Sequence, residues 1–252
     1  MNQAAGLMVS CSNLKRDVDC SLSQFKYLTL AFQPVVCLNT GRVSYYEALL
    51  RDTRGAINSA PSALLSQLEA SGQIKKLDEW VFFRVMNKLK TRRLEGVDVS
   101  INMSAITFSD PDCVARMSNA AKDAGLSSRL IVEITETACF EDMDKIKLSV
   151  QHLKRNGIRI SLDDFGAGYS SFMSLASFDV DALKIDGRYI LDITENVRCS
   201  AFIQGLRVMS NRGLGFKLVG ECIETVDQLN ACKQLGVDYG QGYYFSVPLM
   251  LD

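Results

Sequence analysis

The chain has 252 residues, of which 47% are hydrophobic and 23% charged, and its formal net charge is −1. This composition is ordinary for a soluble globular protein, and the length suits one large domain or two small ones. A net charge near zero gives no electrostatic case for binding a nucleic-acid polymer or an anionic membrane surface, so we expect neither as a partner. Because the chain contains no run of about 18 apolar residues, we expect no membrane span.

The eight cysteines are scattered along the chain without a C-x-x-C pair, and the single histidine is His152. A zinc site is therefore not expected. Scattered cysteines in a chain of this length are typical of reduced thiols, which predicts a cytoplasmic location. The apolar patch at residues 6–9 ends near Cys11, but it has no basic residues ahead of it and is too short for a lipoprotein signal. We interpret residues 1–24 as a polar leader or tether and residues 25–252 as one domain.

From Leu28 onward, short segments with strand composition alternate with segments that have helical periodicity. The expected strands are Leu28–Val36, Val43–Leu50, Val97–Asn102, Leu130–Ile134, Ile158–Asp163, Ala182–Ile185, Phe216–Gly220 and Tyr243–Phe245. The expected helices are Ser62–Ala70, Lys76–Thr91, Pro111–Ala124, Glu141–Lys154, Asn196–Arg212 and Thr225–Leu235. Helix starts are indicated by Asp110-Pro111 and Thr225, and helix ends by Gly125 and Gly236.

The tight turn Asn39-Thr40-Gly41 joins the first two expected strands. They are expected to pair antiparallel, because a parallel pair needs a crossover of a dozen or more residues. The later strands are separated by helices and are expected to be parallel. The pattern therefore predicts an α/β fold, a TIM-like (β/α)8 barrel with one antiparallel strand. The alternative is an open doubly wound sheet, but no glycine-rich phosphate loop follows any early strand.

Polar side chains stand near the carboxyl ends of the expected strands. They are Glu47, Asn102, Glu133, Asp163, Asp164, Lys184, Asp186, Glu221 and Gln241. The parallel strands of such a barrel deliver their carboxyl ends to one face, where active sites are built. A single acid at a strand end is usually a helix cap or a solvated charge. Six carboxylates converging there would repel one another by several kcal/mol unless cations neutralised them.

Oxygen ligands without histidine or cysteine suit Mg²⁺ or Mn²⁺, and the adjacent pair Asp163-Asp164 can serve two ions. Two ions about 3.5–4 Å apart clamp the attacking and leaving oxygens of a phosphodiester displacement. We therefore predict two catalytic residues: Lys184 to position a water or offset developing charge, and Glu221 as general base. The other interpretation of Lys184 is a buried ion pair without chemistry.

These residues lie in segments that together resemble the EAL domain family of cyclic di-GMP phosphodiesterases, over nearly all of Leu28 to Leu249. A lone E-A-L triplet is no evidence, but eight collinear segments in order are specific. The segments are Phe32–Val36, Tyr46–Arg51, Ile101–Ser104, Val132–Thr137, Leu162–Ser171, Leu183–Asp186, Gly220–Thr225 and Gly240–Phe245.

The resemblance implies a barrel whose first strand runs antiparallel, hydrolysis of cyclic di-GMP to linear pGpG, two ions of Mg²⁺ or Mn²⁺, a homodimer and a role in second-messenger signalling. One ion is expected on Glu47, Asn102, Glu133 and Asp163. The other is expected on Asp163 and Asp164, with help from Glu221 or Asp186. The resemblance places Gln33, Leu49, Arg51, Asp186 and Gln241 at substrate-binding positions. It also implies that Glu136 and Glu224 support the metal ligands, with Glu136 acting together with a regulatory loop at residues 164–171.

The chain departs from the family pattern at a few positions. The family usually has an acid at the position of Cys37, a tryptophan at that of Asp52 and often a threonine at that of Ala167, and residues 52–61 lack the usual His-Pro pair. We expect these changes to lie at the substrate rim and the loop, and to affect affinity and regulation more than chemistry.

Two other functions stay open. The first is a receptor that binds cyclic di-GMP without cutting it. Receptors of this fold typically lose the E-A-L glutamate or the paired aspartates, whereas this chain keeps Glu47, Asp163 and Asp164. The second is a regulator that binds protein partners and neither binds nor cuts nucleotide, which the altered rim at Asp52 favours.

Overall fold

In a computed structural model, the described residues are 25–54, 60–91, 94–135, 142–167, 175 and 178–251. The expected leader at residues 1–24, Glu136 and residues 168–171 of the expected regulatory loop lie outside the described residues.

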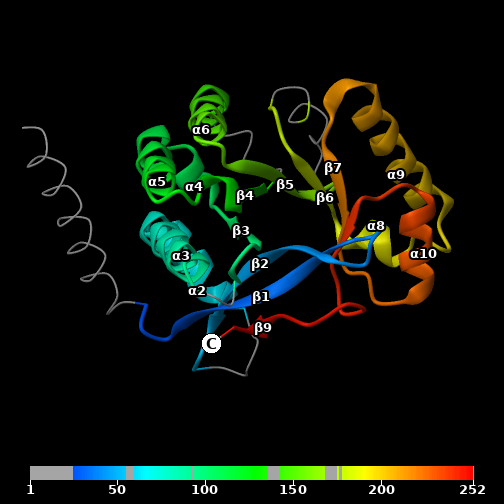
Figure 1. Cartoon of the computed structure of the whole chain (residues 1–252), viewed down its shortest axis with the longest axis horizontal. Coiled ribbons are helices and arrows are strands. Elements are labelled where there is room, and N and C mark those ends of the chain that lie inside the picture. The colour runs from blue at the N-terminus through cyan, green and yellow to red at the C-terminus, as the bar shows by residue number, and fades with distance from the viewer. Residues whose placement is uncertain are drawn as a thin grey trace, which may run out of the picture.

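The strands form one sheet in the order β2-β3-β4-β5-β6-β7-β8-β1-β9, and pairing of β1 with β2 closes the first eight into a barrel (Figure 1). β1 runs antiparallel to both β2 and β8, whereas β2 to β8 pair in parallel. This confirms the predicted barrel and excludes the open sheet. The bounds are β1 Leu28–Cys37, β2 Val43–Asp52, β3 Asp98–Asn102, β4 Leu130–Thr135, β5 Arg159–Phe165, β6 Ala182–Ile185, β7 Lys217–Gly220, β8 Tyr239–Gly240 and β9 Leu249–Met250.

Helices surround the barrel, with α3 to α6 on one side of it and α8 to α10 on the other (Figure 1). Asp110 caps α5 by accepting from the Cys113 N–H, and Thr225 and Gln228 form a capping box at α10. Both predicted starts are thereby confirmed. The bounds are α2 Ser62–Ala70, α3 Ile74–Leu89, α4 Ala105–Phe108, α5 Pro111–Asp123, η2 Ser127–Arg129, α6 Met143–Arg155, α8 Gly187–Leu191, α9 Val197–Met209, η4 Ser210–Leu214 and α10 Val226–Gln234.

The predicted eighth strand at Tyr243–Phe245 is wrong, because β8 lies earlier and these residues form a turn. Gly242 explains the turn: a Cβ at this residue would lie 2.2 Å from the backbone oxygen of Ile223. The chain therefore passes directly over Ile223, whose oxygen accepts from the Tyr244 N–H. Aromatic residues favour strands when one face is buried. Here Tyr243 and Tyr244 are instead 66% and 43% exposed.

The described residues form two separate apolar cores. The larger one fills the space between the strands and the surrounding helices. The smaller one fills the lumen near the amino ends of the parallel strands, and consists of Val35, Tyr45, Ile131 and Val219 with Ala182 and Tyr239 packed against them. Side chains in the lumen therefore plug one end of the barrel, as expected for this fold, and leave its carboxyl end for polar groups.

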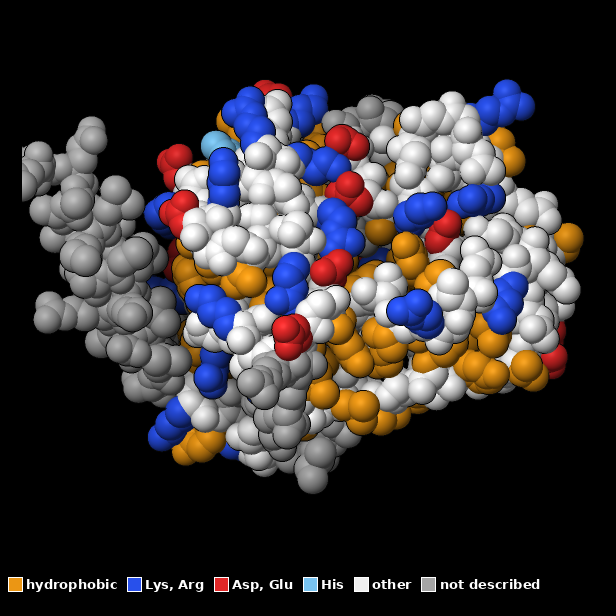
Figure 2. All heavy atoms as spheres, in the orientation of Figure 1, with side chains coloured by type: hydrophobic (Ala, Val, Ile, Leu, Met, Phe, Trp, Pro, Cys, Tyr) orange, Lys and Arg blue, Asp and Glu red, His pale blue; other side chains and the backbone are white. Residues whose placement is uncertain are grey.

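Charged side chains of both signs are interspersed over the face seen in Figure 2. This arrangement agrees with the net charge of −1. Among the described residues, no helix is both long and apolar enough to cross a bilayer.

Candidate functional site

A layer of polar side chains lies directly above the apolar plug of the lumen. Because successive side chains of a strand alternate between its faces, the residue two positions beyond a lumen residue also points into the lumen. Two residues past Tyr45, Ile131, Ala182, Val219 and Tyr239 stand Glu47, Glu133, Lys184, Glu221 and Gln241. On β1, which runs in the opposite direction, Gln33 lies two residues before Val35 and so joins the same layer.

Lys184 lies at the centre of this layer, with its side chain 1% exposed. Its Nζ lies 2.9 Å from a carboxylate oxygen of each of three acids, Glu133, Asp163 and Glu221, and 3.4 Å from one of Glu47. The acids come from β2, β4, β5 and the residue after β7, so four separate segments meet at one ammonium group.

Glu47 is also held by two amides. Asn102 Nδ2 donates to its Oε1 over 2.8 Å, and Gln241 Nε2 donates to its Oε2 over 2.7 Å. The same Gln241 amide donates to Gln33 Oε1 over 3.2 Å, and Gln33 Nε2 donates to the carbonyl of Ser246 over 3.1 Å. These bonds fix the orientation of the Glu47 carboxylate and connect it to the polar side chains of β1, β3 and the segment after β8.

The acids of the layer differ in how easily they ionise. Burial opposes ionisation of Glu47, but Lys184 and the two amides outweigh it and hold its pKa below the usual value. Burial, with added repulsion from Glu47 and Asp163, raises the pKa of Glu133 well above its usual value. Burial likewise raises the pKa of Glu221 to about 8, against the attraction of Lys184. One ammonium group is therefore too few to keep all of these acids ionised.

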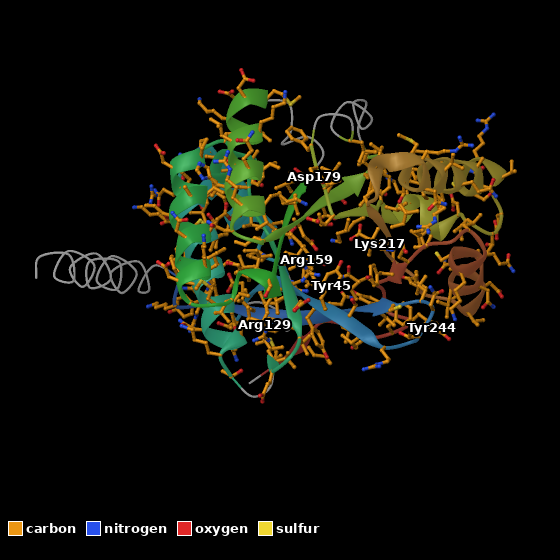
Figure 3. All side chains as sticks on the ribbon, turned by 45° about the horizontal axis from the view of Figure 1, so that its top comes forward. Tyr45, Arg129, Arg159, Asp179, Lys217 and Tyr244 are labelled. Atoms are coloured by element: carbon orange, nitrogen blue, oxygen red, sulfur yellow. The ribbon has the colours of Figure 1, made fainter. Side chains whose placement is uncertain are left out.

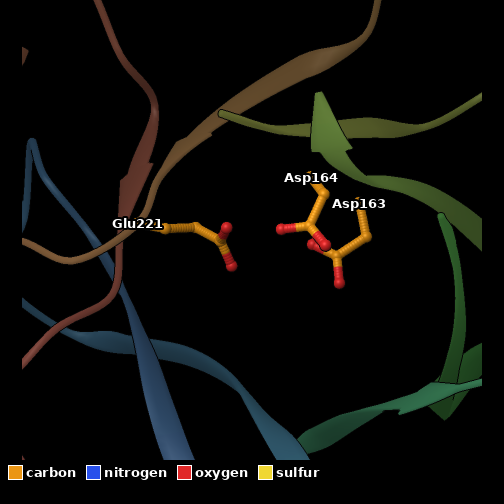
Figure 4. Close-up of side chains that lie close together, drawn as sticks. All are labelled: Asp163, Asp164 and Glu221. Atoms are coloured by element: carbon orange, nitrogen blue, oxygen red, sulfur yellow. The ribbon is translucent and has the colours of Figure 1, made fainter. Parts of the chain in front are cut away.

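Asp163, Asp164 and Glu221 place carboxylate oxygens within 4.8 Å of one another (Figure 4). The acids at the end of β5 and the one after β7 point toward each other across the carboxyl end of the barrel. In addition, the buried Glu133 Oε1 and Gln241 Oε1 accept no hydrogen bond. Clustered oxygen donors, unused acceptors and more acids than one ammonium can keep ionised fit a hard divalent cation.

The remaining expected substrate residues lie around this layer. Leu49 and Arg51 follow Glu47 at alternate positions of β2, so they share its face toward the rim. Arg51 Nη1 donates to the Leu50 carbonyl over 2.8 Å, and its buried Nε has no partner.

Asp186 and Glu224 are not among the residues that contact Lys184. Both oxygens of Asp186 accept from the guanidinium of Arg188, at 2.9 and 3.0 Å, and its side chain caps α8. Glu224 is exposed, and its backbone N–H donates to Gln228 Oε1. Sequence reasoning missed this cap and the pairing with Arg188, although aspartate is one of the preferred residues at a helix N-cap.

The expectation that Cys37 lies at the substrate rim is wrong. Cys37 is the last residue of β1 and pairs with Tyr239 at the start of β8, so it lies at the amino end of the parallel strands. Asp52 does lie at the carboxyl end, as the last residue of β2, where it forms an ion pair of 2.7 Å with Arg54.

A family model described as "EAL domain" matches residues 18–248 of the chain. The chain is 34% identical over 231 residues to the cyclic di-GMP phosphodiesterase NbdA of Pseudomonas aeruginosa, covering 89% of this chain and 29% of that protein. It is 31% identical over 232 residues to the bifunctional diguanylate cyclase/cyclic di-GMP phosphodiesterase MucR of the same organism, covering 89% and 33%. The chain thus spans about a third of the length of these curated relatives.

Solved structures agree with this match. The PaMucR phosphodiesterase in complex with c-di-GMP superposes with a TM-score of 0.80 at 29% identity, covering 94% of this chain and 97% of that one. The Klebsiella pneumoniae BlrP1 complex with manganese and c-di-GMP gives a TM-score of 0.79 at 26% identity, covering 88% of this chain and 56% of that one.

Proposed function

The chain belongs to the EAL domain family, and from this premise we propose that it hydrolyses cyclic di-GMP to linear pGpG with two divalent cations, Mg²⁺ or Mn²⁺. The observation that carries the proposal is the excess of acids around Lys184: four carboxylates within 3.4 Å of one ammonium group. Named relatives are cyclic di-GMP phosphodiesterases, and similar structures hold c-di-GMP.

The proposed ligands divide into two sets that share Asp163. One ion would be held by Glu47, Asn102, Glu133 and Asp163, and the other by Asp163, Asp164 and Glu221. When bound, such ions would offset the charge of the phosphodiester. They would also lower the pKa of a water, so that it loses a proton more easily and becomes a stronger nucleophile. Only oxygen donors are involved, which suits Mg²⁺ and Mn²⁺.

The chain's own residues would orient the reactants and move the proton. The ammonium group of Lys184 would hold the attacking water in place and offset the negative charge that develops on the phosphate. Glu221 would take the proton of that water in its ionised form, which bound cations would favour. Arg51, at the rim above Glu47, offers planar paired donors to a phosphate or to a guanine edge, with Leu49, Gln33 and Gln241 around it.

The proposal includes a cytoplasmic location and a homodimer. The location rests on the scattered cysteines, of which Cys37, Cys113, Cys199, Cys222 and Cys232 are free thiols among the described residues. The homodimer rests on the family resemblance, and sedimentation of the purified chain measures it.

The test is to incubate the purified chain with cyclic di-GMP and Mg²⁺ or Mn²⁺, and to resolve the products by chromatography. We expect linear pGpG from the wild type and no product from Glu47→Ala, because Glu47 is itself a proposed ligand that the amides of Asn102 and Gln241 hold in place. Calorimetry with and without metal separates the two alternatives. Binding without turnover would identify a receptor, and no binding at all would favour a regulator that contacts other proteins.

A further inference from the structure

Two non-glycine residues of the described chain have positive φ: Asp164, at 54°, and Cys222, at 56°. Both belong to the acidic cluster of Figure 4 or adjoin it, since Asp164 is a member and Cys222 directly follows Glu221 (Figure 4). Left-handed backbone is unfavourable for a residue with a side chain and persists only where the surroundings enforce it. The elements that pack against these two positions therefore determine where the carboxylates lie.

Gly187, the first residue of α8, packs against Cys222. A Cβ added to Gly187 would lie 2.5 Å from Cys222 Sγ and 2.9 Å from Cys222 Cβ. Rotation of the thiol could relieve the first contact, but the second could be relieved only by moving the backbone. Gly187 is not among the residues with positive φ, so glycine is required here for space and not for conformation.

Tyr189, two residues further along α8, packs against the segment that follows Asp164. Its hydroxyl donates to the carbonyl of Gly166 over 3.3 Å, and a Cβ on Gly166 would lie 2.6 Å from its ring. The ring stacks on Phe202 of α9 at 4.2 Å between centroids, and Phe202 in turn stacks on Phe165 at 6.3 Å. The backbone after Asp164 is thus fixed by an aromatic stack that spans three elements.

We propose that the first turn of α8 acts as a wedge between the segments that follow β5 and β7, and positions the carboxylates of Asp164 and Glu221, with Gly187 and Tyr189 as positioning residues. The wedge follows β6, so the strand that supplies Lys184 leads directly into the helix that places the acids around it. Asp186 fixes the start of the wedge by accepting from the Arg188 N–H over 2.8 Å. This inference rests on the proposed function, because the wedge acts through carboxylates that would bind the ions.

The test measures Mn²⁺ affinity of the full chain by electron paramagnetic resonance, which does not depend on turnover. In Gly187→Ala the new methyl group displaces Cys222 and with it Glu221, so Mn²⁺ affinity falls by about 10–100-fold, the range found for residues that orient metal ligands. Adding Cys222→Gly removes both contacting atoms and suits the left-handed backbone, so the double variant regains wild-type affinity. Gly205→Ala is the matched control, because a Cβ there meets nothing within 4 Å.

Tyr189→Leu and Tyr189→Phe provide a second pair in case Gly187→Ala does not fold. Leucine removes both the ring and the hydroxyl and should lower Mn²⁺ affinity, whereas phenylalanine keeps the ring and should retain most of it. Wild-type affinity in both Gly187→Ala and Tyr189→Leu would overturn the wedge alone. A fall in Gly187→Ala that Cys222→Gly fails to reverse would also overturn it. A wild-type chain that binds no Mn²⁺ would overturn the proposed function, and the wedge with it.

Discussion

The two ends of the barrel differ in how their acidic side chains are paired with cations. At the amino end, where Arg159 and Lys217 lie (Figure 3), three acids near the starts of strands each form an ion pair with a cation from another element. The pairs are Asp98 with Arg159 at 2.6 Å, Asp181 with Lys154 at 2.8 Å, and Asp238 with Arg207 at 3.0 Å and Lys217 at 3.2 Å. At the carboxyl end, four acids share Lys184.

The comparison separates charges that support the fold from charges that serve a ligand. Matched pairs at a partly exposed end contribute little to stability and require nothing further. An unmatched group of buried acids has a cost in the free chain, and divalent cations would remove that cost when they bind. Perturbing the two ends should therefore have effects of different size and different metal dependence.

The largest effect is expected from Lys184→Met, which removes the only cation that contacts the four acids in the described chain. Breaking a buried ion pair from one side costs about 3–5 kcal/mol, so the unfolding free energy of the metal-free chain should fall by this amount. Urea denaturation measures it, and added Mn²⁺ should restore part of the loss. Turnover should be abolished.

Lys217→Met is the matched control at the amino end. Its side chain is 54% exposed and Asp238 keeps Arg207 as a second partner, so the loss should stay below about 1 kcal/mol. Equal losses in the two variants would remove the distinction between the two ends.

A smaller, pH-dependent effect is expected from Glu221→Gln. The pKa of Glu221 is raised from 4.5 to about 8, so the folded chain favours its protonated form. The stabilisation that this gives is complete below pH 4.5 and disappears as the pH rises through about 8. Between these values the metal-free wild type should therefore lose stability relative to Glu221→Gln, which stays neutral.

Thermal unfolding of both proteins across this pH range checks the prediction, and parallel curves would contradict it. Mn²⁺ should reduce the loss of stability that the wild type shows as the pH rises, because a carboxylate must be ionised to bind metal and the bound ion stabilises that form. For the same reason, turnover should fall on acidification and recover in part with excess Mn²⁺.

The smallest effect is expected from Asp98→Asn. The pair with Arg159 is about one-third exposed on both sides, so its loss should cost less than about 1 kcal/mol and leave turnover unchanged. Urea denaturation and the chromatographic assay together check this. A large loss of turnover would contradict this prediction, because it would show that the ion pair at the amino end affects the candidate site.

Much of the barrel could be predicted from the sequence, because local signals dictate it. The hairpin turn at residues 39–41 set the antiparallel strand, and the capping residues Asp110 and Thr225 marked their helices. β6 lies at the predicted residues, Ala182–Ile185. The elements that were missed, α4, η2, α8 and β9, are too short to give a periodic signal, and the two-residue β8 was hidden by the aromatic turn that follows it.

The sequence predicted which residues form the candidate site, but not the contacts that hold these residues in position. Strand ends indicated which acids would gather around Lys184, because parallel strands share one end. Cys37 was misplaced because β1 runs the other way, so its carboxyl end lies opposite to theirs. The contact of Gly187 with Cys222 had no sequence signal, since it joins residues far apart in the chain through packing alone.

The central claim is that divalent cations bind the acids at the carboxyl end of the barrel and enable hydrolysis. A Mn²⁺ titration of the metal-free chain in the presence of cyclic di-GMP tests it most directly. Bound Mn²⁺ is followed by electron paramagnetic resonance and the nucleotides by chromatography in the same samples. We predict that pGpG is absent without metal, increases with bound Mn²⁺ and never forms with Glu47→Gln. Cyclic di-GMP recovered intact from a wild-type chain saturated with Mn²⁺ would contradict it.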